Sequence, residues 1–355
     1  MNTKNETPQD DRHPRFSLRA ARIMLILWAL VAWACDNAKE EPPVPPAPVD
    51  DIVYFGGGVT FSDKSRGDYR CAPKYEIFDH CFEMIDGHWY ALEFNAYHAG
   101  GSDVNLIVDG RKKETILSDC HSVKDAFTYV KDNKLHAYIF YFESEDKYRA
   151  VEYADGKIKS LGELQPFDRI LFLREDHGDI YTMWTLNTPN FLEVGNIVIL
   201  KNGTPIDERV NLQEGTSLYR MWDMEVENGN VYTFFTLKGD YYTEGGYYAV
   251  GGRKYKTTGL TNPCYGQVSD GEVIIEGYNQ QPGWIKSLLW KDGNTRGILA
   301  GMPVVSPRGL KVVNGDVYYL VTCFDERSRE SASTMYKNGA VIGSFPNEFS
   351  GFKVL

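Results

Sequence analysis

The side chains best suited to bind a ligand lie in the predicted connections between β-strands. Aromatic rings offer flat apolar faces, while carboxylates and guanidinium groups form directional hydrogen bonds, so their combination suits a sugar or peptide site. The candidate ligand contacts are Asp79, His80, Asp168, Arg169, Trp222, Asp223, Tyr241, Tyr242, Tyr265, Trp284 and Arg308. Packing is the alternative interpretation, because aromatic residues make up 14% of the chain and some fall in any loop.

Motifs for catalysis and metal binding are missing from the sequence. It contains no His-Glu-x-x-His, no Gly-x-Ser-x-Gly, no Gly-Lys-Ser/Thr loop and no EF-hand pattern. His80 and His121 each precede a predicted first strand, but no ligand spacing accompanies them, and we predict neither a metal nor a cofactor. If the protein is a polysaccharide hydrolase or lyase, its carboxylates would be Asp79, Asp168 and Asp223.

A recurring turn followed by a strand shows which elements must position these residues. Each copy places an apolar or aromatic marker after a turn, and the intervals between markers run from 36 to 51 residues. The markers are Tyr54, Tyr90, His136, Tyr181, Tyr232, Ile274 and Tyr318. A second series of tight-turn dipeptides follows at a constant offset, and such dipeptides between apolar runs are strong hairpin signals. These are Asp109-Gly110, Asp155-Gly156, Asn202-Gly203, Gly251-Gly252, Asp292-Gly293 and Asn338-Gly339.

Four strands in each unit of roughly 40–45 residues are typical of a β-propeller blade. The chain ends with a lone first strand in Phe349–Leu355, and the unit that begins near Asp51 lacks a first strand. We therefore predict an all-β, seven-bladed propeller over residues 51–355, closed by pairing of the C-terminal strand with the N-terminal partial blade. Six or eight blades are the alternatives.

The N-terminus has the features of an export signal. Arg15, Arg19 and Arg22 precede an apolar run that is too short to span a bilayer, which takes roughly 20 residues. Ala32-Trp33-Ala34-Cys35 resembles the lipobox of bacterial lipoproteins. The following Asp36–Glu41 resembles the surface-export signal of lipoproteins in the Bacteroidota. Ordinary cleavage without a lipid is the alternative.

This resemblance implies a division of the chain into three parts. Residues 1–34 would be a signal peptide, and residues 35–50 would hold the lipidated Cys35 and a Pro-rich linker. The propeller would occupy residues 51–355. Anchoring through Cys35 implies a membrane partner and a place on the outer membrane, at the cell surface.

Charge and cysteine content limit the partners and the cross-links. The net charge is −11, and residues 1–34 carry a net charge of +2, so the remainder carries −13. We expect no nucleic-acid partner, because sequence-independent binding to nucleic acid needs a basic surface. Five cysteines remain after Cys35, and Cys81 with Cys120 is the possible disulfide that we would test first. The alternative is that all five are small buried residues.

These observations favour a non-catalytic binding module that recognises a glycan or protein ligand through the propeller loop face. Two other classes stay open at this point. One is an extracellular polysaccharide hydrolase or lyase, and the other is a structural subunit of an envelope complex. Binding is preferred because catalytic motifs are missing from the sequence.

Overall fold

Tight turns with left-handed backbone divide the chain into hairpins. Asn202 and Gly203 both have positive φ, at 50° and 79°, as the common two-residue hairpin turn requires. The same holds for His177 and Gly178, at 51° and 82°. The computed structural model describes residues 51–56, 59–62, 69–71, 75–95, 101–165, 168–185, 197–206, 218–237, 245–281, 284–291, 293–297, 305–325, 330–346 and 348–355.

Seven antiparallel sheets of four strands each are built from these hairpins, and we number them as blades. Blade 1 follows the short 3-10 helix η1 (Asp79–Cys81) and contains β4 (Phe82–Ile85), β5 (His88–Phe94), β6 (Ser102–Val108) and β7 (Arg111–Cys120). Blade 2 contains β8 (Ser122–Lys131), β9 (Lys134–Ser144), β10 (Lys147–Ala154) and β11 (Lys157–Glu163). Blade 3 contains β12 (Arg169–Asp176), β13 (Asp179–Thr185), β14 (Ile197–Lys201) and β15 (Thr204–Ile206).

The remaining blades repeat this order. Blade 4 contains β16 (Leu218–Glu227), β17 (Asn230–Leu237), β18 (Gly246–Val250) and β19 (Arg253–Lys256). Blade 5 contains β20 (Asn262–Ser269), β21 (Glu272–Gln281), β22 (Trp284–Lys291) and β23 (Asn294–Gly297). Blade 6 contains β24 (Val305–Val313), β25 (Asp316–Asp325), β26 (Glu330–Lys337) and β27 (Ala340–Phe345). Blade 7 contains β28 (Gly351–Val354), β1 (Ile52–Gly56), β2 (Val59–Ser62) and β3 (Tyr69–Arg70).

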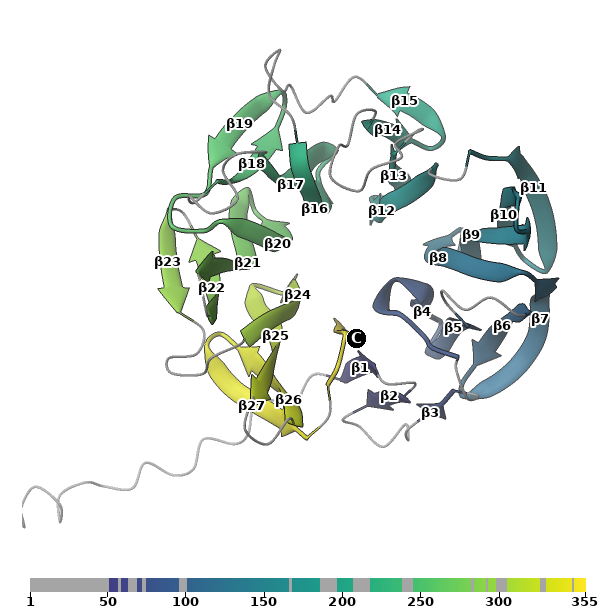
Figure 1. The fold of residues 1–355 in the computed structure, drawn as a ribbon, viewed down its shortest axis with the longest axis horizontal. Helices are drawn as coiled ribbons and strands as arrows, with labels where there is room; N and C mark the ends of the chain where they lie inside the picture. Colours follow the sequence, from purple (N-terminus) through teal and green to yellow (C-terminus); the bar gives the residue numbers. More distant parts are fainter. Residues whose placement is uncertain are drawn as a thin grey trace, which may run out of the picture. The chain divides into compact units, whose positions relative to one another are not determined.

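The blades stand around a common centre, with the first strand of each blade innermost (Figure 1). Blade 7 joins the two ends of the chain, because β28 pairs antiparallel with β1 and places Phe352 opposite Tyr54. The prediction of a seven-bladed propeller closed in this way is confirmed, and six or eight blades are excluded. All seven markers lie in second strands, from Tyr54 in β1 to Tyr318 in β25.

Apolar side chains fill the spaces between neighbouring blades. At the closure, Ile52, Tyr54, Leu320 and Phe352 form one buried cluster that joins blades 6 and 7. Gly56 is required at this seam, since a Cβ atom there would lie 2.9 Å from the Cα of Phe349. Burial of each cluster removes apolar surface from water and holds adjacent blades together.

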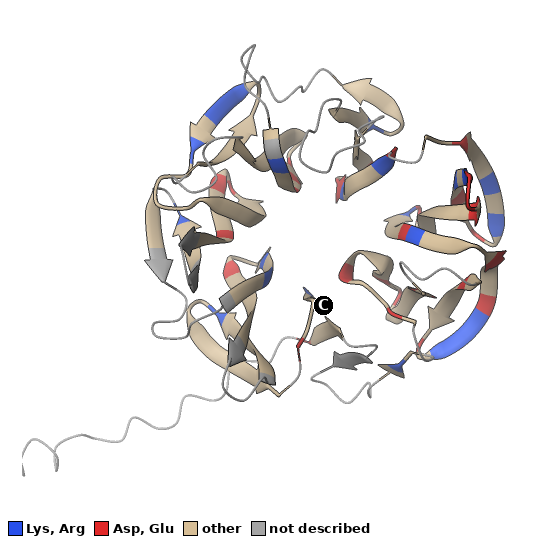
Figure 2. Cartoon of the chain, viewed as in Figure 1, with Lys and Arg blue, Asp and Glu red and all other residues tan. Residues whose placement is uncertain are grey.

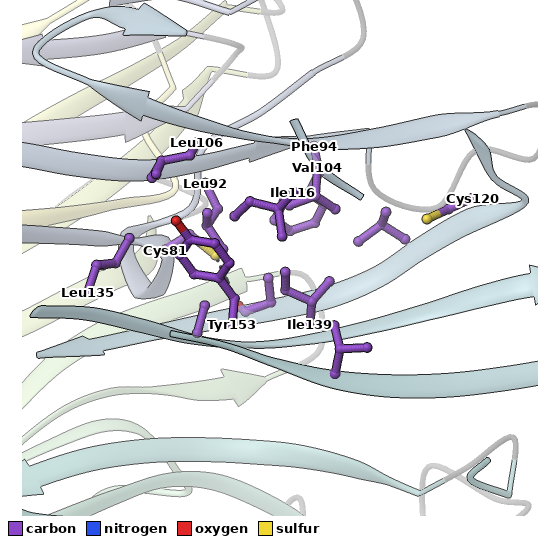
Figure 3. Close-up of a cluster of buried hydrophobic side chains, with 14 of the residues drawn as sticks. Cys81, Leu92, Phe94, Val104, Leu106, Ile116, Cys120, Leu135, Ile139 and Tyr153 are labelled. Carbon is purple, nitrogen blue, oxygen red and sulfur yellow. Dashed lines mark hydrogen bonds between the residues drawn. The ribbon is translucent and has the colours of Figure 1, made fainter. Parts of the chain in front are cut away.

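The predicted disulfide between Cys81 and Cys120 is wrong. Both cysteines are free and buried, and Figure 3 shows Cys120 at the edge of the apolar cluster, apart from Cys81. Cys81 precedes the innermost strand of blade 1, whereas Cys120 ends the outermost. Three strand spacings amount to about 14 Å, and a disulfide tolerates at most about 7 Å between Cα atoms.

The predicted signal peptide, Cys35 and the Pro-rich linker lie outside the described residues and stay predictions. Asp50–Leu355 forms one compact unit. No helix in the described part of the chain has the length and apolarity needed to span a bilayer.

Candidate functional site

A central cavity of about 420 Å³ is lined by residues from the innermost elements of all seven blades. Its wall includes Asp79 and Glu83 from blade 1, and it includes Lys353 from blade 7. A volume of this size falls in the range of small-molecule sites, roughly 300–1,000 Å³. The cavity is therefore the candidate functional site.

One strand position supplies three of the charged residues in the cavity wall. In each of blades 1 to 6 it lies seven residues before the marker, as Arg174 does before Tyr181, and it pairs directly with the marker across the first hairpin. The six residues at this position are Glu83, Tyr129, Arg174, Glu225, Gln267 and Lys311. All of them except Glu225 line the cavity.

Bulges in the first strands aim a second set of side chains at the centre. The register shifts after Val123 in β8 and after Met221 in β16. The residue after each bulge is a carboxylate whose Oδ1 accepts the next backbone N–H, at 2.9 Å for Asp125 and 2.8 Å for Asp223. These carboxylates fix the bulged backbone and face the cavity.

His80 connects two carboxylates on the blade 1 and blade 2 side of the cavity. Its Nδ1 lies 3.3 Å from Asp79 Oδ1, and its Nε2 lies 3.1 Å from Asp125 Oδ1. Burial alone would lower the pKa of His80, but Cys81, Asp125 and Asp79 together raise that pKa well above its usual value. Burial alone would raise the pKa of Asp79, but the hydrogen bond and the charge of His80 lower it to about 2. The group is thus an imidazolium held between two carboxylates.

Arg174 forms the second charged group, between blades 3 and 4. Its Nη2 donates to Asp223 Oδ1 at 2.5 Å and its Nε to Glu225 Oε2 at 3.3 Å, while Nη1 donates to the carbonyl of Leu173 at 2.8 Å. The backbone N–H of Gly266 donates to Asp223 Oδ2 at 2.9 Å. Burial raises the pKa of Asp223 to about 6, although the charge of Arg174 opposes the shift.

Trp222 of β16 also lines the cavity. Its indole Nε1 donates to Thr236 Oγ1 at 2.9 Å, and the guanidinium of Arg220 lies 4.0 Å from its ring centroid. Tyr278 contacts it edge-on, with the ring centroids 6.0 Å apart. The ring is therefore held in one orientation before any ligand arrives.

The structure brings some of the predicted site residues together and separates others. Asp79, His80, Trp222, Asp223 and Tyr265 line the cavity. Three predicted residues lie away from it.

Asp168 caps a turn between blades 2 and 3, where the backbone N–H of Gln165 donates to Asp168 Oδ2 at 3.1 Å. Arg169 begins β12 and does not line the cavity. Arg308 contacts Glu348 across the seam between blades 6 and 7. Tyr241 and Tyr242 lie outside the described residues, and Trp284 begins β22 with its side chain outside the described part.

The loop-based prediction missed Arg174, Lys311, Asp125, Glu83 and Lys353 in the cavity wall. A signal for three of them was present in the sequence, because Glu83, Arg174 and Lys311 each lie seven residues before a marker. Among the described residues, no group of three or more His, Cys, Asp or Glu side chains is arranged to hold a metal ion.

No protein-family model matches the chain, and no curated protein matches it either. Among solved structures it is similar to a chain from a study of two prolyl endopeptidases, with 10% identity and a TM-score of 0.52. That match covers 95% of this chain but only 56% of the endopeptidase chain.

Two further structures are similar at lower TM-scores. The β-propeller domain of the Trilobed protease from Pyrococcus furiosus has 12% identity, coverage of 85% of this chain and 98% of that one, and a TM-score of 0.46. A GH43_1 enzyme from Xanthomonas citri has 9% identity, coverage of 63% and 91%, and a TM-score of 0.33. At such identities the likeness concerns the propeller fold alone.

Proposed function

We propose that this protein is a lipid-anchored, cell-surface binding protein that takes a glycan into the central cavity without catalysing a reaction on it. The observation that supports this proposal is the combination in one cavity of an oriented aromatic ring, Trp222, with carboxylates and cations. Sugar rings pack their apolar faces on aromatic side chains and donate hydroxyl hydrogen bonds to carboxylates. A cavity of about 420 Å³ admits a sugar or a short chain segment but no folded protein.

A hydrolase is the second candidate, because Asp79 and Asp223 have opposite pKa shifts in one cavity. The pKa of Asp79 is lowered to about 2 and that of Asp223 is raised to about 6, as a base and an acid would require. The hydrogen bonds favour binding, however. Asp223 is almost fully buried, and both of its oxygens accept hydrogen bonds from Arg174, Met224 and Gly266. Asp79 is committed to His80.

Glycan binding is tested with the full chain in detergent and a panel of neutral and acidic oligosaccharides, by calorimetry. We expect saturable binding without release of shortened sugars, and we expect Trp222→Ala to weaken it about 5-fold or more, because an aromatic contact is worth roughly 1 kcal/mol or more. Tyr255→Ala is the matched control, since Tyr255 lies 40% exposed on the outer strand β19. If Trp222→Ala and Tyr255→Ala bind the glycan with equal affinity, the central cavity is not the glycan site.

The anchor rests on Cys35 and is tested separately. Replacing Cys35 by alanine removes the thiol that would carry the lipid, so we expect the variant to lose incorporation of an alkyne-labelled fatty acid. We also expect it to leave the membrane fraction, because stable membrane attachment needs buried acyl chains. Cys71→Ala is the control, as Cys71 is buried in the propeller. Retention of the label by Cys35→Ala would refute lipidation at this site.

A further inference from the structure

Most charged side chains in the cavity wall are satisfied by partners within the protein. Arg174 uses all three side-chain nitrogens, and His80 uses both ring nitrogens. Lys353 pairs with Glu83 at 3.2 Å. Such completely paired groups have little capacity left for a ligand.

Lys311 is the exception among the cavity cations. It lies on β24 opposite Tyr318 and lines the cavity, and in the described structure its ammonium group has no carboxylate within 4 Å and no hydrogen bond. The charges of Glu225, Asp223 and Asp79 act on it only from beyond ion-pair distance. An ammonium group in a partly enclosed site without a direct counter-ion is an incomplete anion site.

Tyr265 adds a second unused donor in the same cavity. Its side chain lines the cavity from the adjacent blade 5, and its hydroxyl group has no hydrogen bond in the described structure. Burial, together with the charges of Cys264 and Asp79, raises its pKa, so the hydroxyl group keeps its proton at neutral pH. The blade 5 and blade 6 side of the cavity thus offers donors for an anionic oxygen.

Blades 1 and 2 offer unused acceptors in the same cavity. Asp79 and Asp125 each contact His80 through Oδ1, and the Oδ2 atom of each has no hydrogen bond in the described structure. In Figure 1, β4 and β8 lie across the centre from β20 and β24. A ligand in the cavity therefore meets both donors and acceptors.

We infer, on the basis of the glycan-binding role proposed above, that the ligand is an acidic sugar whose carboxylate binds Lys311 and Tyr265. The hydroxyl groups of the sugar donate to Asp79 and Asp125. A neutral sugar would displace water from the Lys311 ammonium without supplying a counter-ion, and that costs binding free energy. The preference for uronic acids over neutral sugars therefore depends on one cation.

The test compares oligomers of galacturonic and glucuronic acid with oligomers of galactose and glucose, using the full chain and calorimetry. We expect the acidic oligomers to bind about 10- to 100-fold more tightly, as a charge-assisted hydrogen bond provides. Lys311→Gln should remove this preference and leave the weaker neutral binding unchanged. Lys311→Arg should keep it, which separates the role of the charge from a folding defect.

Lys254→Gln is the matched control, because it removes the same charge from the exposed outer strand β19, where Figure 2 shows basic residues. Affinity for the acidic sugar should also fall as the pH rises through the pKa of Lys311. Burial and the charge of Arg174 lower that pKa, whereas the charges of Glu225, Asp223 and Asp79 raise it. Lys311→Arg should show no such fall below pH 10.

The outcomes separate this inference from the proposed function. Neutral oligomers that bind as tightly as acidic ones, with Lys311→Gln unchanged, would overturn the acidic-sugar inference and leave glycan binding intact. Binding of a short peptide carboxylate through Lys311, with no uronic acid bound, would overturn both. Absence of binding to any saccharide in the panel would also overturn both.

Discussion

Replacing Phe352 by alanine is expected to lower the free energy of unfolding by about 3–5 kcal/mol, as large-to-small changes of buried aromatic residues do. Phe352 lies in β28, is 2% exposed and packs in the cluster with Ile52, Tyr54 and Leu320. Domains are stable by only about 5–15 kcal/mol, so the loss is a large fraction of the total. Urea unfolding followed by tryptophan fluorescence measures it.

Leu355→Ala is the control for this variant, since Leu355 follows β28 and is 38% exposed. We expect its unfolding midpoint to match the parent protein. A similar midpoint for both variants would show that the seam between β28 and β1 does not hold the ring closed. If the seam does hold, Phe352→Ala should also aggregate more readily, because opening it exposes the unpaired edge of β1.

Replacing Arg174 by methionine is expected to cost about 3–5 kcal/mol, because removal of one partner leaves buried charges uncompensated. Arg174 is the direct cation partner of Asp223, at 2.5 Å, and of Glu225, at 3.3 Å. Methionine keeps most of the side-chain volume, so the loss reports charge rather than a cavity. Thermal and urea unfolding at pH 7 measure it.

The pH dependence of this variant follows from Asp223. Burial raises its pKa from the usual 3.8 to about 6, so folding favours the protonated form. Asp223 therefore contributes stability below its unfolded pKa and loses that contribution as the pH rises through about 6. Without Arg174 its folded pKa rises further, and we expect the difference between variant and parent to widen from pH 5 to pH 8.

Two variants control for this effect. Arg149→Met removes an arginine of β10 whose ion pair with Glu143, at 2.8 Å, lies at the surface, and we expect little change in its midpoint. Adding Asp223→Asn to Arg174→Met removes the buried carboxylate that has lost its cation, and this should recover part of the lost stability. If Arg174→Met is as stable as Arg149→Met, the ion pair between Arg174 and Asp223 does not stabilise the fold.

Turn chemistry explains why the fold was predictable. Dipeptides such as Asn202-Gly203 adopt positive φ because of local backbone sterics, and their repetition gave the blade period. The pairing of β28 with β1 followed from counting strands. The C-terminal segment was a first strand without a blade, and the N-terminal blade had no first strand. The disulfide prediction failed because both cysteines lie near the start of a first strand in the sequence, yet they lie on opposite edges of blade 1. Position along the chain does not give the distance across a blade.

Sequence by itself therefore determined the seven-bladed ring and placed Asp79, His80, Trp222, Asp223 and Tyr265 near one site. Only the tertiary structure decided which polar groups are paired there, because pairing depends on strand register, on bulges and on contacts between residues far apart in sequence. Arg174 meets Asp223 from a neighbouring blade, whereas the Lys311 ammonium has no carboxylate within ion-pair distance among the described residues. No local pattern encodes that difference, since it arises when the seven first strands converge on the centre.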